Sequence, residues 1–71
     1  MRYMVVVEQG AEGFGAYVPD LPGCVAAGES RDEVLSLIRE AIELHIEAMR
    51  EDGEPLPAPS SSGEYVDVGA A

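Results

Sequence analysis

The stretch "AYVPDLPGCVAAG" (residues 16–28) decides how this chain folds, because it joins two apolar segments through a turn. Pro19 ends the first segment, since proline cannot donate to a sheet ladder and is confined to strand ends and edges. Asp20 can bond to backbone groups two residues on, Pro22 presets its own φ, and Gly23 accepts a positive φ. The stretch therefore predicts a tight corner between two antiparallel strands.

Three strands are expected around this corner. The segments are "RYMVVVE" (2–8), "FGAYVP" (14–19) and "CVAAG" (24–28), and the glycine-rich "QGAEG" between the first two has the composition of a hairpin loop. The first segment is apolar on both of its faces. This pattern indicates a strand that is covered on two sides, or by a helix on one side and by a second subunit on the other.

The residues from 30 to 51 carry the strongest local signal in the chain. Ser30 and Glu33 form a capping box, and Gly53 closes the far end, so a long helix is predicted. Its apolar stripe is wider than the arc of about 100° that one sheet would hide. We expect a second copy of the chain to cover the excess, as a homodimer or homotetramer, the alternative being a C-terminal tail folded back over the flank. The residues assigned to this oligomer interface are Leu37, Ile38, His45 and Met49.

The segment after the helix changes character. Prolines and serines at 54–63 favour an extended, flexible tether, and "EYVDV" (64–68) alternates like a short strand that could add to an exposed sheet edge. The predicted organisation is an α+β domain at 1–53, the tether at 54–63, and a strand and tail at 64–71. The fold class is β-β-β-α-β, with a three-stranded antiparallel sheet, one amphipathic helix packed on it and a short C-terminal strand.

Length and charge narrow the possible partners. The 71 residues carry 14 carboxylates against four arginines, a formal net charge of −10. Such a chain repels the phosphates of nucleic acid, so a basic protein is the natural partner. One cysteine cannot close an intrachain disulfide. The start lacks the pattern of a signal peptide and the apolar stretches are far shorter than a membrane span, so we expect a cytoplasmic protein without membrane contact.

Few side chains suggest chemistry. Cys24 has no histidine or basic residue nearby in the sequence to lower its pKa, which favours a small packing residue over a nucleophile. His45, the single histidine, lies on the apolar face of the helix and has no titrating partner in the sequence. Glu40, Glu43 and Glu47 share one helix face, which would suit either a metal site or, as we prefer, a solvated or partner-facing surface. We therefore predict no catalytic residues, no metal and no cofactor.

These motifs together resemble a known family. The order of "YMVVVE", "AYVPDLPGCVAAG", "SRDE" opening a helix with "EAIELHIEA", and "GEPLPAP" is similar to that of the HicB-like antitoxins of bacterial toxin–antitoxin systems. The similarity covers residues 3 to about 59. It implies a partial ribonuclease-H-like fold that binds and blocks a small, basic, HicA-like messenger-RNA interferase.

Many members of that family also carry a C-terminal DNA-binding module, and nothing after residue 68 could build one. Direct DNA binding by this chain is therefore not expected. The antitoxin function is set against two others: a stand-alone oligomerising or regulatory module that has lost its toxin, and an enzyme, which would need more convergent catalytic groups than the sequence offers. The residues predicted to contact the partner are Glu8, Glu12, Tyr17, Asp20, Leu21 and Pro22.

Overall fold

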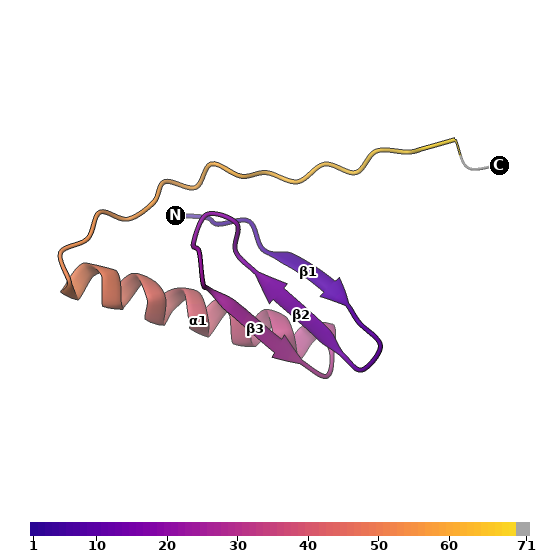
Figure 1. The fold of residues 1–71 in the computed structure, drawn as a ribbon, viewed down its shortest axis with the longest axis horizontal. Coiled ribbons are helices and arrows are strands. Elements are labelled where there is room, and N and C mark those ends of the chain that lie inside the picture. Colours follow the sequence, from indigo (N-terminus) through magenta and orange to yellow (C-terminus); the bar gives the residue numbers. More distant parts are fainter. Residues whose placement is uncertain (70–71) are drawn as a thin grey trace.

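The computed structural model describes residues 1–69 and contains one sheet and one helix (Figure 1). Strands β1 (Val6–Gln9), β2 (Phe14–Tyr17) and β3 (Val25–Gly28) form an antiparallel sheet in the order β1-β2-β3. Val6 pairs with Tyr17, and Tyr17 pairs with Val25 on its other side. The predicted α+β class, with a three-stranded antiparallel sheet and one long helix, is confirmed.

The strands are shorter than the sequence pattern suggested. The first was expected over 2–8, but residues 2–5 have no strand partner, because β2 ends at Tyr17 and the chain turns away after Pro19. The hairpin between β1 and β2 closes with the amide of Gly10 donating to the carbonyl of Gly13 at 2.8 Å. Alternating apolar residues therefore indicate which residues can form a strand. The length of the partner strand decides how many of these residues are paired.

The corner between β2 and β3 is built from its own backbone. The amide of Leu21 donates to the carbonyl of Val18 at 3.1 Å, and the amide of Cys24 donates to the carbonyl of Leu21 at 3.1 Å. Gly23 has a φ of 84°, in the left-handed region that glycine adopts without steric cost. The predicted tight turn is confirmed.

Helix α1 (Arg31–Glu51) begins one residue after its N-cap. The Ser30 hydroxyl accepts a hydrogen bond from the amide of Glu33 at 3.1 Å, and the Glu33 carboxylate accepts one from the amide of Glu29 at 3.0 Å. These bonds satisfy amides that have no partner within the helix. At the other end, Gly53 follows the last turn with a φ of 70°.

The helix lies across one face of the sheet, mainly against β2 and β3 and less against β1 (Figure 1). The core lies between the sheet and α1. It is made of side chains from β2, from the corner after β2 and from the first half of the helix. Tyr3, Val5 and Val7 pack against it from the first segment. The fully or nearly buried residues are Ala16, Val18, Leu21, Cys24, Val34 and Ile38.

The segment after the helix is extended, and residues 54–69 contain neither helix nor strand. The expectation of a short C-terminal strand at 64–68 is wrong for the isolated chain, because this segment reaches no sheet edge and its apolar side chains are exposed. The division of the chain at residues 53 and 63 stays a prediction. Within residues 1–69, no helix has both the length and the hydropathy that crossing a bilayer requires.

Candidate protein–protein interface

The sheet presents one face to α1 and the other face to solvent. Ala16 is buried against the helix, so its neighbour Tyr17 points to the opposite face, as do the residues paired with Tyr17. Val6, Tyr17 and Val25 thus form a row of apolar side chains across all three strands, which we call the outer strip. Tyr17 is 42% exposed and Val25 is 64% exposed. Among residues 1–69 no helix covers this row, so it is available to a partner.

Two acidic side chains lie beside the outer strip. Glu8 pairs across the sheet with Gly15, and both Glu8 and Glu12 line a shallow hollow at the hairpin end of the sheet. Gly15 and Ala27 also line this hollow. The structure therefore brings Glu8, Glu12 and Tyr17 to one side of the molecule, where carboxylates flank an apolar row.

Asp20 lies at the other end of the sheet, and its predicted contact with a partner stays a prediction. Its carboxylate accepts hydrogen bonds from the amides of Ser60 (3.0 Å) and Ser61 (2.9 Å) and from their hydroxyls (3.1 and 2.8 Å). These bonds, above all that from the Ser61 amide, lower the pKa of the Asp20 carboxyl from 3.8 to about 2. Asp20 thus anchors the tail to the corner.

Pro22 and Leu21, the other two residues predicted to contact a partner, differ in exposure. Pro22 is exposed at the tip of the corner, whereas the Leu21 side chain has no exposed area and fills the core beneath it. The expectation that Leu21 lies on a contact surface is wrong, because the turn folds its side chain inward. Val25 was missed, although its place directly across the corner from Tyr17 followed from the predicted hairpin.

The residues assigned to an oligomer interface also differ in exposure: one is buried in the core and three are accessible at the helix surface. Ile38 is buried against the sheet and belongs to the core of the single chain, so that assignment is wrong for Ile38. Leu37 is 38% exposed on one flank of α1, and His45 and Met49 are half-buried. Apolar side chains are nevertheless uncovered on the helix, as the wide stripe predicted.

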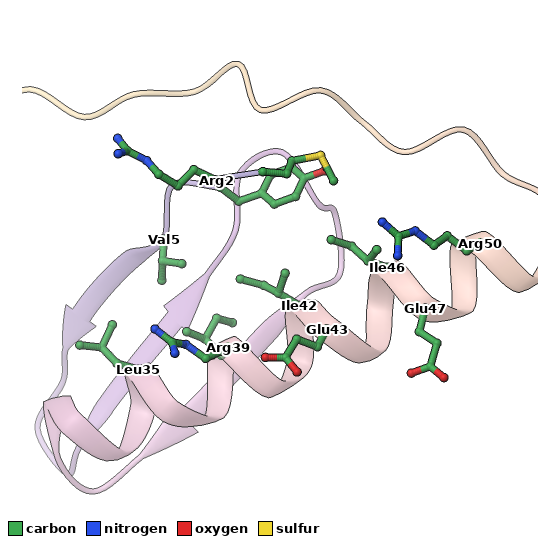
Figure 2. Close-up of a pocket in the computed structure, with 12 residues that line it drawn as sticks. Arg2, Val5, Leu35, Arg39, Ile42, Glu43, Ile46, Glu47 and Arg50 are labelled. Carbon is green, nitrogen blue, oxygen red and sulfur yellow. The ribbon is translucent and has the colours of Figure 1, made fainter.

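A groove runs between the first residues of the chain and the other flank of α1 (Figure 2). It has a volume of about 740 Å³. Val5 and Ile42 face each other across it, and Leu35 and Ile46 extend its apolar wall along the helix (Figure 2). The charged residues of its rim are Arg2, Arg39, Glu43, Glu47 and Arg50.

The groups that could carry chemistry do not converge. Burial raises the pKa of the Cys24 thiol, which keeps the sulfur in its unreactive protonated form. Within residues 1–69, no group of three or more histidine, cysteine, aspartate or glutamate side chains is placed to hold a metal ion. The geometry offers surfaces for binding a protein and no assembled reaction centre in that part of the chain.

Comparison with known proteins agrees with the motifs. A family model described as the HicB-like antitoxin of bacterial toxin–antitoxin systems matches residues 3–69. The chain belongs to the HicB-like antitoxin family. The predicted resemblance is thereby confirmed, and it extends about ten residues further than the motifs indicated, through the C-terminal "EYVDV" segment.

Individual relatives support the assignment. A 14.9 kDa protein of Haemophilus phage HP1, encoded in its rep-hol intergenic region, is 39% identical over 66 residues, which are 93% of this chain and 50% of the phage protein. Antitoxin HicB 2 of Photorhabdus laumondii is 33% identical over 72 residues, spanning all of this chain and 52% of the relative. The chain thus spans about half the length of these two relatives.

A solved structure shares the fold as well. A chain of the HicA3 and HicB3 toxin-antitoxin complex superimposes with a TM-score of 0.67 at 35% sequence identity, over 83% of this chain and 72% of that chain. The sheet and helix described above are therefore those of a protein that was solved within a toxin–antitoxin assembly.

Proposed function

We propose that this chain is the antitoxin of a toxin–antitoxin system and neutralises a small, basic, HicA-like messenger-RNA interferase by binding to it. The observation that carries the proposal is the family match over residues 3–69, together with the likeness to a chain solved in a toxin–antitoxin complex. The net charge of −10 supports it, because a basic RNA-cleaving protein is complementary to an acidic one.

The outer strip and its acidic neighbours are the proposed contact surface. Tyr17 and Val25 offer exposed apolar area in the middle of the sheet, and aromatic side chains of this kind often supply much of the binding energy at an interface. Glu8 and Glu12 would stand where the toxin otherwise holds RNA phosphates. Pro22, which is exposed at the tip of the corner, is a further proposed contact, while Asp20 would contribute indirectly by fixing the tail.

The same reasoning favours a binding protein that acts in the cytoplasm without catalysis. Inhibition by masking needs no nucleophile, base or metal from the antitoxin. It also needs no contact with nucleic acid, and the acidic surface would oppose binding of these 71 residues to DNA. We therefore propose that the chain acts by occupying a surface of the toxin.

Toxin-dependent RNA cleavage is the direct test. The proposal predicts that a small basic protein is encoded beside this chain, and that it cleaves RNA alone and loses that activity when the chain is added in a several-fold molar excess. Labelled RNA and this chain should also exclude each other from the toxin. Undiminished cleavage would contradict the antitoxin proposal and leave the stand-alone oligomerising or regulatory module as the better explanation.

The surface is tested by truncating one exposed side chain at a time. Tyr17→Ala and Val25→Ala should each speed dissociation from the toxin, because both remove apolar contact area from the outer strip. Leu44→Ala is the matched control, since Leu44 is 67% exposed on the helix and lies off the strip. Equal effects of all three substitutions would place the contact elsewhere.

A further inference from the structure

The groove between residues 1–5 and α1 differs in charge from the chain as a whole. Three of the four arginines, Arg2, Arg39 and Arg50, line it, together with two of the 14 acidic side chains, Glu43 and Glu47. Its lining thus carries three positive charges against two negative ones, in a chain whose net charge is −10. The groove is therefore complementary to an anion, although the chain as a whole is not.

The helix wall of the groove combines apolar side chains with a cation on one stripe of α1. Leu35, Arg39, Ile42 and Ile46 follow one another at spacings of four, three and four residues. Such spacings place successive side chains on the same flank of a helix. Figure 2 shows the Arg39 side chain between Leu35 and Ile42 along the helix. A ligand that follows this wall would meet a positive charge beside a row of apolar groups.

The opposite wall is the segment that precedes β1. Val5 faces Ile42 across the groove (Figure 2). The volume of about 740 Å³ lies within the range of about 300–1,000 Å³ that is usual for small-molecule sites, which are mostly apolar with a few polar groups. The groove therefore has the size and the composition that suit a small amphiphile with one apolar chain and one anionic group.

Arg39 is the arginine best placed to hold the anionic group. Arg50 belongs to the last turn of α1, where it offsets the partial negative charge of the terminal carbonyls. Figure 2 shows the Arg2 guanidinium directed away from α1. Arg39 lies in the middle of the helix and is exposed, so its guanidinium is accessible. A guanidinium binds a carboxylate through two parallel hydrogen bonds, which favours a carboxylate as the anionic group.

We propose that this groove binds a free fatty acid, with its carboxylate at Arg39 and its alkyl chain along Ile42 and Ile46, opposite Val5. Burial of methylene groups supplies the affinity, and the arginine selects the charge of the head group. The site lies outside the surface proposed to contact the toxin, so it does not depend on the proposed function.

Titration of the full chain with decanoate, at concentrations below those at which it forms micelles, tests the proposal. Methyl NMR resonances of Val5, Ile42 and Ile46 should shift and saturate. Hexanoate should bind roughly tenfold more weakly or worse, because its shorter chain buries less apolar surface. Shifts of the same methyl groups when the ligand-free protein is diluted would show that a second copy fills the groove instead. That result, or the lack of a saturable shift with decanoate, would overturn the proposal.

The part of Arg39 is tested with two ligands and two arginines. Arg39→Gln should weaken decanoate binding roughly threefold or more and leave the binding of decanol unchanged, since decanol has the same chain without the charge. Arg31→Gln removes the same charge from an exposed arginine outside the groove and should change neither. Equal losses for the two variants would attribute the effect to net charge, and equal losses for the two ligands would attribute it to packing. Either outcome would refute the placement of the carboxylate.

The course of the alkyl chain is tested with a second pair of variants. Ile46→Ala should weaken the binding of both decanoate and decanol roughly threefold or more, because it removes apolar surface from the wall. Leu44→Ala shortens a side chain that is 67% exposed and outside the groove, so it should change neither. Ile46 lies outside the core cluster, and both variants should therefore melt close to the parent. Unchanged binding to the Ile46→Ala protein would contradict the proposal.

Discussion

Asp20 links two parts of the chain that are 40 residues apart. Its carboxylate binds the amides and hydroxyls of Ser60 and Ser61, so a short polar contact fixes the direction in which the tail leaves the corner. Local sequence rules explain why an aspartate occurs in a turn, but they contain no information on a partner so distant. The corner itself was predicted, whereas the bonds expected from Asp20 to backbone groups two residues on are replaced by bonds to Ser60 and Ser61.

The anchor should respond to acid in a defined window. Because the pKa of Asp20 is lowered from 3.8 to about 2 in the folded chain, its contribution is complete above about pH 4 and is lost as the pH falls through 2. The amide resonance of Ser61, followed by NMR between pH 5 and 1.5, should titrate with a midpoint near 2. Asp20→Asn should abolish this titration, whereas a midpoint near 3.8 in the parent would mean that the anchor is not formed in solution.

Gly23 is the corner residue that the turn requires to be glycine. Its φ is 84°, and a Cβ placed there would meet no atom within 4 Å, so any cost of substitution arises from the backbone and not from a clash. Gly23→Ala should lower the free energy of unfolding by about 1–2 kcal/mol in urea denaturation. Gly15→Ala, at an ordinary strand conformation, is the control and should change it by less than about 1 kcal/mol. Equal effects would refute the turn argument.

At the scale of elements, the local signals and the antiparallel arrangement of the strands were predicted, whereas the lengths of the strands were not. The capping box located the start of α1 to within one residue, because the Ser30 hydroxyl accepts from the Glu33 amide and the Glu33 carboxylate accepts from the Glu29 amide. The lengths of β1 and β2 depend instead on where the partner strand stops. Leu21 and Ile38 were misassigned for a similar reason. Both are clearly apolar, but the sequence does not say whether the chain's own core or a partner buries them.

The C-terminal segment shows this limit most clearly. Alternation at 64–68 predicted a strand, and the family match extends through it, yet a strand exists only where a second strand offers its backbone. In the single chain no edge is within its path. Local alternation can therefore indicate strand character, but it cannot indicate whether a partner strand is within reach.

At the scale of the whole molecule, the sheet and helix form a small body whose two uncovered surfaces have different chemistry. The groove between the first five residues and α1 is apolar with a mixed rim, whereas the solvent face of the sheet combines the outer strip with Glu8 and Glu12. The solvent face is the surface proposed above to contact a basic protein, and the groove lies outside that surface.

The net charge of −10 predicts how salt affects the rate at which this chain associates with its basic partner. Rim charges steer the encounter of two proteins more than they hold the formed complex, and salt screens them over a Debye length of about 8–10 Å. Association with the basic partner, followed by stopped-flow fluorescence, should slow by roughly tenfold or more between low and high salt, while dissociation changes little.

Reversing Glu8 and Glu12 to lysine should reduce the association rate further than reversing Glu40 and Glu51, two exposed glutamates on α1 that change the net charge equally. If both pairs slowed association to the same extent, the total charge alone would guide the encounter and the face that carries Glu8 would have no special part in it. A larger effect of the first pair would show that the toxin approaches the solvent face of the sheet.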